Sequence, residues 1–178
     1  MKYQMRASSK KRPATKKPIA VRGTAHSAKV PKTKSSGVTV YVDTSVIIAK
    51  IVAQKLPSSE IIGAVQKGLK IVEMENLRAV LDLPMEGLAA KLGISKATLH
   101  RRKASGRLDP AESDRVVRFA RLMGKAIEVL ESEDNARKWL NSPQVGLGGA
   151  VPLDYAETEV GAREVEDLLS RIEYGVYS

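Results

Sequence analysis

The sequence predicts an all-α protein, with helices from about residue 56 onward and a basic segment ahead of them. From Leu56 the apolar residues recur with the period of an amphipathic helix. Proline and glycine then divide these runs into pieces of helical length. Apolar residues make up 43% of the chain but aromatic residues only 4%, so we expect a core of leucine, isoleucine, valine and alanine. A chain of 178 residues suits one domain, or two small domains and a tail.

The first residues of the chain are expected to be a disordered basic tail. Residues 1–37 hold eleven lysines and arginines and no acid, and they show no apolar periodicity. Such a segment buries too little surface to offset the entropy of ordering it. Two roles remain open for it, an arm on DNA and a solvated tail. The stretch that follows, VTVYVDTSVIIAKI at 38–51, is rich in β-branched residues and predicts a short strand or an extended arm.

Seven helices follow this stretch. The first begins at the sequence PSSE, 57–60, and ends near Gly68. Pro84 ends the second helix, and Asp109 caps the fifth just ahead of Pro110. The first helix places its apolar residues on one face: Ile61, Ile62, Val65 and Leu69. The other helices are expected at 72–83, 85–92, 95–104, 110–132, 134–140 and 158–174.

The stretch MEGLAAKLGISKATLHRRKASGR, 85–107, has the spacing of a helix-turn-helix. Ala89 lies four residues before Gly93, and Leu99 lies six residues after it. The small residue lets two helices approach closely, the glycine takes the turn, and the later apolar residue holds the second helix against the first. Ser95 is placed to cap that second helix. The buried side is completed by Leu88, Leu92 and Ile94.

The second helix of this motif is the candidate for reading DNA. Residues 75–125 hold eleven basic and six acidic residues, whereas residues 126–178 hold four basic and eleven acidic ones. A basic middle suits a polyanion, and an acidic end suits a different partner. Two alternatives stay open: Arg102 pairs with Glu112 or Asp114 instead of DNA, and the region is a plain three-helix pack with a solvated basic face. The DNA-binding candidates are Lys96, Thr98, His100, Arg101, Arg102 and Lys103.

The chain resembles a known family over residues 56–178, the Xre/MbcA/ParS-type antitoxins of RES–Xre toxin–antitoxin modules. The resemblance runs through the helix-turn-helix and continues in a long C-terminal block. The N-terminal 37 residues lie outside it. The motifs that carry it are Arg101-Arg102, Glu112-Ser113-Asp114-Arg115, Trp139-Leu140, Pro143, Leu147-Gly148-Gly149, Pro152-Leu153, Thr158-Glu159 and Gly161-Ala162.

The resemblance implies two domains and two partners. Residues 38–125 would form a helical dimerisation and DNA-binding domain, and residues 126–178 a small helical toxin-binding domain. The toxin implied is a RES-domain enzyme that consumes NAD, and the antitoxin would cover its active site and repress its own operon as a homodimer on operator DNA. The toxin-binding candidates are Gly149, Pro152, Thr158, Glu159, Arg163, Glu166, Arg171, Tyr174, Gly175, Val176, Tyr177 and Ser178.

The last predicted helix supports a binding role on physical grounds. Its apolar residues fall on one face, Gly161, Val165, Leu168, Leu169 and Ile172. That face must pack either on the chain's own long helix or on a partner. The acidic residues near the end would suit a toxin pocket that attracts the phosphates of a dinucleotide, or they form a solvated face. The tail after Tyr174 could then reach a cleft that the helix only flanks.

The connector at 139–162 predicts a shaped segment and no nucleotide loop. The run Gly146-Leu147-Gly148-Gly149 lacks the third glycine of G-x-G-x-x-G, and a Trp-bearing helix precedes it where that motif needs a strand. Pro143 and Pro152 stiffen the segment, and Trp139 is expected to pack on the helical body. The glycines permit tight turns, and Thr158 is placed to cap the last helix.

The composition argues against an enzyme. There is no cysteine, and the two histidines are far apart, so a metal site or a thiol nucleophile is not expected. Although YVDTSVIIA resembles the first strand of PIN-type nucleases, that family needs several more acidic residues to form its metal site, and a different pattern occupies the region after Asp43. We therefore expect a cytoplasmic protein without cofactor, metal or membrane contact. The alternative to the antitoxin is a free-standing helix-turn-helix transcriptional regulator with a C-terminal interaction domain.

Overall fold

The computed structural model describes residues 47–176, and the regular elements of these residues are all helices, which confirms the all-α fold for this part of the chain. The predicted tail at 1–37 and the first residues of the predicted strand, 38–46, lie outside the described residues. The helices are α1 (Ile47–Val52), α2 (Ser58–Lys67), α3 (Ile71–Leu81), α4 (Met85–Lys91), α5 (Lys96–Ser105), α6 (Pro110–Leu130), α7 (Glu133–Leu140), the 3₁₀ turn η1 (Val145–Leu147), α8 (Pro152–Tyr155) and α9 (Glu159–Glu173).

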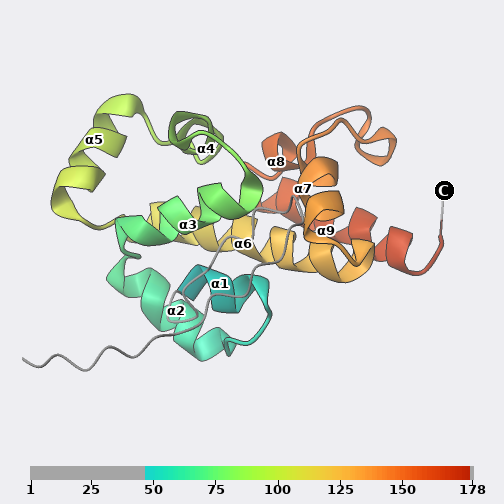
Figure 1. The fold of residues 1–178 in the computed structure, drawn as a ribbon, viewed down its shortest axis with the longest axis horizontal. Coiled ribbons are helices and arrows are strands. Elements are labelled where there is room, and N and C mark those ends of the chain that lie inside the picture. The colour runs from blue at the N-terminus through green and yellow to red at the C-terminus, as the bar shows by residue number, and fades with distance from the viewer. Residues whose placement is uncertain (1–46, 177–178) are drawn as a thin grey trace, which may run out of the picture. The chain divides into compact units, whose positions relative to one another are not determined.

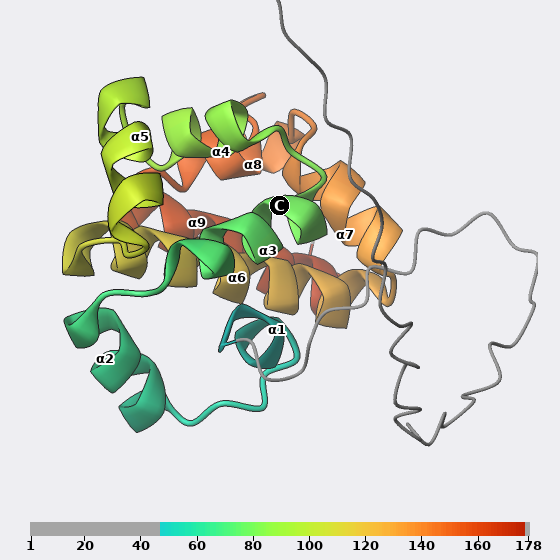
Figure 2. The ribbon, with the colours of Figure 1, turned by 60° about the vertical axis from the view of Figure 1, so that its left-hand side comes forward.

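The long helix α6 runs through the middle of the described body, with α5 toward one end of it and α7 toward the other (Figures 1 and 2). It contacts α1, α2, α3, α7 and α9. Its start is the predicted one: Asp109 and Glu112 form a capping box, and Pro110 is the first helical residue. Phe119, Leu122 and Met123 on this helix are fully buried. One core therefore lies along α6 and serves both halves of the chain.

The predicted strand at 38–51 is wrong for its last residues, because Ile47–Val52 form α1. The buried carboxylate of Glu73 on α3 accepts hydrogen bonds from the backbone nitrogens of Ile47 at 3.2 Å and Ile48 at 3.0 Å. These bonds satisfy donors that a helix start leaves free. Ile48 and Ile51, three residues apart, are both buried, so packing at helical spacing outweighs the β preference of the sequence.

Helix α2 begins at Ser58, as predicted, but its apolar face is only partly covered. None of its residues is fully buried, and Ile62 is 57% exposed. Ile61 and Val65 are half-buried against the core, whereas Leu69, which is buried, lies beyond the end of the helix. The four residues predicted for one buried face are thus split between the core and the surface.

The C-terminal helices pack back on α6. Ala162, Val165 and Leu169 are buried, and α9 contacts α6, so the apolar face of this helix is covered by the chain's own long helix. Leu168, predicted for the same face, is half-buried and lies against the connector. A Cβ on Gly146 would stand 2.6 Å from its side chain, so this close contact requires glycine.

The connector between α7 and α9 contains two short elements, η1 and α8, that the sequence did not predict. The backbone of Gln144 pairs with Ala150 across η1, and Gly148 and Gly149 adopt positive φ. Trp139 is half-buried and packs against the core, as predicted. Thr158 caps α9 by accepting a hydrogen bond from the Gly161 nitrogen at 3.1 Å. The connector is therefore a shaped segment.

Candidate nucleic-acid and protein interfaces

The helix-turn-helix consists of α4, a glycine turn and α5. Ala89 is 2% exposed and Leu99 is 4% exposed, so both pack inside the motif. Gly93 lies in the turn with a φ of 65°, a conformation that L residues other than glycine rarely adopt. Leu88, Leu92 and Ile94 are buried. The predicted roles of Ala89, Gly93 and Leu99 are therefore confirmed, as is the burial of the apolar residues around them.

Ser95 begins α5 as an N-cap. The backbone nitrogen of Thr98 donates to Ser95 Oγ at 3.2 Å, and Ser95 Oγ donates to Thr98 Oγ1 at 3.0 Å. Thr98 is half-buried, and its hydroxyl accepts this bond at the first turn of the helix. The cap leaves the start of α5 on the surface, where a recognition helix contacts base edges.

The exposed face of α5 carries a concentrated positive charge. Lys96, Arg101 and Lys103 are exposed and form no ion pair with a carboxylate of the described residues. His100 is exposed beside them. Four of the six DNA-binding candidates on α5 are therefore exposed, and they can contact phosphates or guanine edges.

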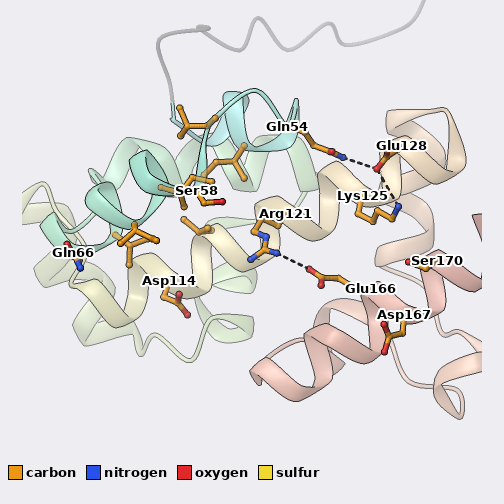
Figure 3. A pocket seen from close by; sticks show the side chains of 16 residues that line it. Gln54, Ser58, Gln66, Asp114, Arg121, Lys125, Glu128, Glu166, Asp167 and Ser170 are labelled. Carbon is orange, nitrogen blue, oxygen red and sulfur yellow. Dashed lines mark hydrogen bonds and ion pairs between the residues drawn. The ribbon is translucent and has the colours of Figure 1, made fainter.

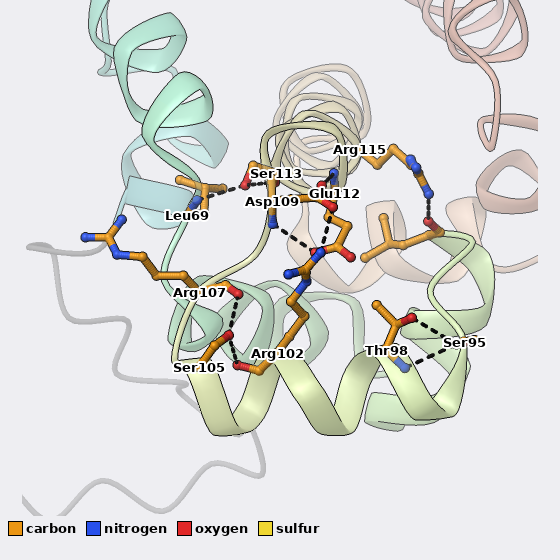
Figure 4. Close-up of polar contacts among 11 residues, drawn as sticks. Leu69, Ser95, Thr98, Arg102, Ser105, Arg107, Asp109, Glu112, Ser113 and Arg115 are labelled. Carbon is orange, nitrogen blue, oxygen red and sulfur yellow. Dashed lines mark hydrogen bonds and ion pairs between the residues drawn. The ribbon is translucent and has the colours of Figure 1, made fainter.

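Arg102 points inward instead, as Figure 4 shows. Its Nε donates to Glu112 Oε2 and its Nη2 donates to Asp109 Oδ2, both at 2.7 Å, and its side chain is 20% exposed. The hydrogen bond to Glu112 raises the pKa of this guanidinium above its ordinary value. The sequence offered Glu112 and Asp114 as partners for Arg102. The pairing with Glu112 is confirmed, whereas Asp114 pairs with Arg118 at 3.0 Å. The donors of Arg102 are therefore directed at the carboxylates of Glu112 and Asp109, whereas the other basic candidates of α5 are exposed.

The toxin-binding candidates are not one cluster. Pro152 is buried as the first residue of α8, so it is corrected to a packing residue that presents no surface to a partner. Thr158 is the cap of α9, and Glu159 pairs with Arg118 at 3.1 Å and with Arg163 at 3.3 Å. Glu166 and Arg171 are half-buried, whereas the exposed candidates are Gly149, Arg163, Tyr174, Gly175 and Val176. Tyr177 and Ser178 lie outside the described residues.

Sequence reasoning missed three exposed apolar residues in this region. Val145 on η1 is 96% exposed, Val160 on the first turn of α9 is 73% exposed, and Tyr155 on α8 is 42% exposed. Isolated exposed apolar residues are ordinary, but η1 and α8 both contact α9, and Val160 lies on an exposed face of that helix. Helical phase could have found that face, because Val160, Glu164, Asp167, Arg171 and Tyr174 follow at i, i+4, i+7, i+11 and i+14. We call these five residues the outer α9 stripe.

Three basic residues of α6 hold α9 through ion pairs. Arg118 pairs with Glu159 at 3.1 Å, Arg121 with Glu166 at 3.9 Å, and Lys125 with Glu173 at 2.6 Å. The hydrogen bond from Lys125 to Glu173 raises the pKa of that lysine. Lys91 on α4 also pairs with Asp154 on α8. We call the three α6–α9 pairs the α6–α9 ladder.

A groove of about 930 Å³ lies between α2 and α9, with α6 along its floor (Figure 3). Its α2 side is apolar, with Ile61, Ile62 and Val65 among the lining residues. Its α9 side is polar and contributes Glu166, Asp167 and Ser170. No cluster of three or more potential metal ligands occurs among residues 47–176, and no helix there is long and apolar enough to cross a membrane.

These elements define a helix-turn-helix protein with a second, C-terminal helical domain that packs on the central helix α6. Two family models match accordingly. The antitoxin Xre-like helix-turn-helix domain matches residues 60–121, and the antitoxin Xre/MbcA/ParS C-terminal toxin-binding domain matches residues 125–175.

Curated relatives agree with both matches. An Antitoxin Xre of Yersinia enterocolitica is 33% identical over 128 residues, which cover 69% of this chain and 86% of the relative. An Antitoxin Xre of Photorhabdus laumondii is 36% identical over 48% of this chain and 60% of the relative. A Prs ADP-ribosylating antitoxin of a Sphingobium species is 25% identical over 66% of this chain and 80% of the relative. The chain belongs to the Xre/MbcA/ParS-type antitoxins, and it joins a helix-turn-helix to a C-terminal antitoxin domain.

Proposed function

We propose that the protein neutralises a RES-domain toxin that consumes NAD and that it represses its own operon through the helix-turn-helix. The observation that carries this proposal is the pair of dissimilar surfaces on one body. Helix α5 exposes basic residues that have no carboxylate partner among residues 47–176, and the outer α9 stripe exposes apolar residues at both of its ends. Basic residues suit DNA phosphates, whereas exposed apolar and aromatic residues suit a protein interface.

The toxin side of the proposal uses the outer α9 stripe, with Val145 and Val176 beside it. Val160 and Tyr174 lie at opposite ends of the stripe and are 73% and 76% exposed. In a protein interface an exposed tyrosine is a residue that fills a pocket and contributes much of the binding energy, a valine adds apolar area, and charged residues between them set the register. The name of the Sphingobium relative joins an antitoxin to ADP-ribosylation, a reaction that takes ADP-ribose from NAD, and this supports the proposed chemistry of the toxin.

A truncation tests how the toxin is blocked. We propose that residues 175–178 extend from α9 into the toxin's cleft, so deleting them should weaken neutralisation while DNA binding stays intact. NAD turnover by the purified toxin is measured at rising antitoxin concentration. The matched control is Glu75→Gln, an exposed change on α3. Unchanged inhibition by the truncated protein would contradict this part of the proposal.

The DNA side is tested with the DNA upstream of the protein's own gene. The wild type should retard that duplex more strongly than a scrambled duplex of the same length, with an affinity that falls as salt rises. Equal affinity for both duplexes would leave the antitoxin role standing but remove operon repression. A protein that binds the promoter strongly but has no toxic neighbour would instead be the free-standing regulator.

We further propose that the protein is a homodimer through the groove beside α2. Helix α2 exposes apolar residues that the described chain leaves partly uncovered, and the opposite wall includes Glu166 and Asp167. The α1–α2 region carries exposed Lys50, Lys55 and Lys67, so a symmetric partner would bring lysines to that acidic wall.

The dimer proposal predicts a change in mass from one substitution. Ile62→Glu should convert the dimer to a monomer in sedimentation, because it places a charge on the proposed interface. Val145→Glu is the control, since that valine is also apolar, is 96% exposed against 57% for Ile62, and lies on η1. A wild-type protein that sediments as a monomer at tens of micromolar would contradict the homodimer.

A further inference from the structure

The first turns of α6 hold the recognition helix α5 at both of its ends. At the far end, Arg102 on α5 reaches Glu112 and Asp109, each at 2.7 Å. At the near end, Arg115 Nη1 donates to the carbonyl of Leu92 at 2.5 Å, in the turn just before α5 (Figure 4). Two contacts ten residues apart determine the direction of a helix better than one. We infer that Arg102 and Arg115 are positioning residues that set the orientation of α5 for DNA, although Arg102 is a basic residue of the recognition helix and Arg115 a basic residue of the helix that follows it.

The Arg102 contact is built into the capping box of α6. Glu112 Oε2 accepts from the Asp109 nitrogen at 2.9 Å as well as from Arg102, and Asp109 Oδ1 accepts from the Glu112 nitrogen at 2.8 Å. The Glu112 side chain is only 7% exposed. Removing the guanidinium would leave a carboxylate short of a partner in a nearly dry site, which is costly. Arg102 is thus committed to α6 and is a poor candidate for a phosphate contact.

The Arg115 contact is closely fitted to the turn. A Cβ added to Gly93 would lie 3.0 Å from Arg115 Nη1, so the guanidinium occupies the space that a side chain would take there. Two residues earlier in the sequence, Ser113 Oγ accepts from the Leu69 nitrogen at 2.8 Å. Three residues in the first turns of α6, Glu112, Ser113 and Arg115, therefore contact the recognition helix, the segment before α3 and the turn of the motif. Base readout tolerates only small errors in helix placement, so these contacts matter for specificity.

This inference rests on the proposed DNA-binding function, and the effect of salt separates positioning from phosphate contact. Losing a phosphate contact lowers the slope of log affinity against log salt by about 0.9 and weakens binding to all sequences alike. Losing a positioning contact lowers affinity for the specific site and leaves the salt slope and the non-specific affinity unchanged. The two mechanisms therefore predict different results for the salt slope and for the non-specific affinity.

The experiment compares four full-length variants on the upstream duplex and on a scrambled duplex at several salt concentrations. Arg102→Gln should weaken specific binding by roughly tenfold, the effect of losing one charge-assisted hydrogen bond, with an unchanged salt slope. Glu112→Gln should do the same although it makes the protein more positive. Arg102→Lys should rescue only in part, because an ammonium cannot reach two carboxylates as a planar fork does. Lys103→Gln, the matched control on the same helix, should lower the slope and both affinities.

Two results would overturn the inference. One is a lower salt slope for Arg102→Gln together with full rescue by Arg102→Lys, which is the behaviour of a phosphate contact. The other is unchanged hydrogen exchange in Arg102→Gln and Glu112→Gln, measured without DNA, since positioning requires the amides of α5 to exchange faster relative to those of α6. The exchange measurement keeps the two ideas separate: if the wild type binds neither duplex, the proposed DNA function fails while the positioning contacts are still tested. Thermal unfolding confirms that each variant is folded.

Discussion

The two candidate surfaces differ in how they use charge. On α5, Lys96, Arg101 and Lys103 are exposed without carboxylate partners among the described residues. On α9, by contrast, three glutamates are paired with basic residues of α6 in the α6–α9 ladder: Glu159, Glu166 and Glu173. The basic excess of 75–125 and the acidic excess of 126–178 therefore cancel in part inside the molecule. Charge counted along a sequence overstates the charge that a partner meets.

The outer α9 stripe has an exposed apolar or aromatic residue at each end. Val160 and Tyr174 are exposed and belong to none of the three ion pairs of the ladder. We expect binding at α5 to depend steeply on salt and binding at α9 to depend on it weakly. The four predictions below test this contrast, from the largest expected effect to the smallest.

The largest effect is expected from the core that both surfaces share. Phe119→Ala should lower the free energy of unfolding by about 3–5 kcal/mol, because Phe119 is fully buried on α6. DNA binding and toxin neutralisation should then fail together on warming, in one transition seen by calorimetry. Two separate transitions would show that the halves are stabilised independently.

The next effect concerns the ends of the outer α9 stripe. Val160→Asp and Tyr174→Ala together should weaken toxin binding by about 2 kcal/mol or more, and DNA binding should not change. Asp at 160 is compatible with the first turn of α9, so the helix itself is retained. Isothermal titration with the toxin measures the loss, and Val72→Asp is the control, because Val72 is an exposed valine (41%) on the first turn of α3. Equal losses for test and control would remove the stripe from the interface.

A smaller effect is expected from a single basic residue of α5. Arg101→Gln should reduce the salt slope of DNA binding by about 0.9 and leave the affinity for the toxin unchanged. Fluorescence anisotropy across a salt series gives the slope. If the slope is unaltered while toxin binding weakens, the two surfaces have been assigned the wrong way round.

The smallest effect is expected from the ladder. The pair Arg121–Glu166 spans 3.9 Å and its side chains are 62% and 37% exposed, so water screens it. A double-mutant cycle with Arg121→Gln and Glu166→Gln should give a coupling of about 0.2–1 kcal/mol in thermal unfolding. A coupling several times larger would mean that the ladder, rather than the apolar core, holds α9 on α6.

The helix-turn-helix was predictable because its signals are local. Gly93 supplies the turn, Ala89 the close approach and Ser95 the cap, and each acts within a few residues of its partners. The resemblance to the antitoxin family was carried by contiguous motifs, and both family models confirm it. The capping box at Asp109 was predictable for the same local reason.

The errors came from contacts between distant residues. Residues 47–51 were predicted as strand because no local signal shows that Glu73, more than twenty residues away, binds the start of α1. Nothing local shows that Pro152 is buried or that Glu159 meets Arg118. For Arg102, the sequence offered both a DNA contact and a partner in Glu112, and only packing distinguishes them. Of the outer α9 stripe, Arg171 and Tyr174 were among the predicted toxin-binding residues, but Val160 was missed because the apolar residues of this helix were considered only for its buried face.

One measurement tests the central claim most directly, which is that this antitoxin protects NAD from a partner enzyme. The protein encoded beside this chain is expressed alone, with the wild type, and with the Val160→Asp, Tyr174→Ala variant, and cellular NAD is assayed. We predict that NAD falls sharply with the neighbour alone, recovers with the wild type, and recovers less with the variant. NAD that stays constant in all three cultures would contradict the account.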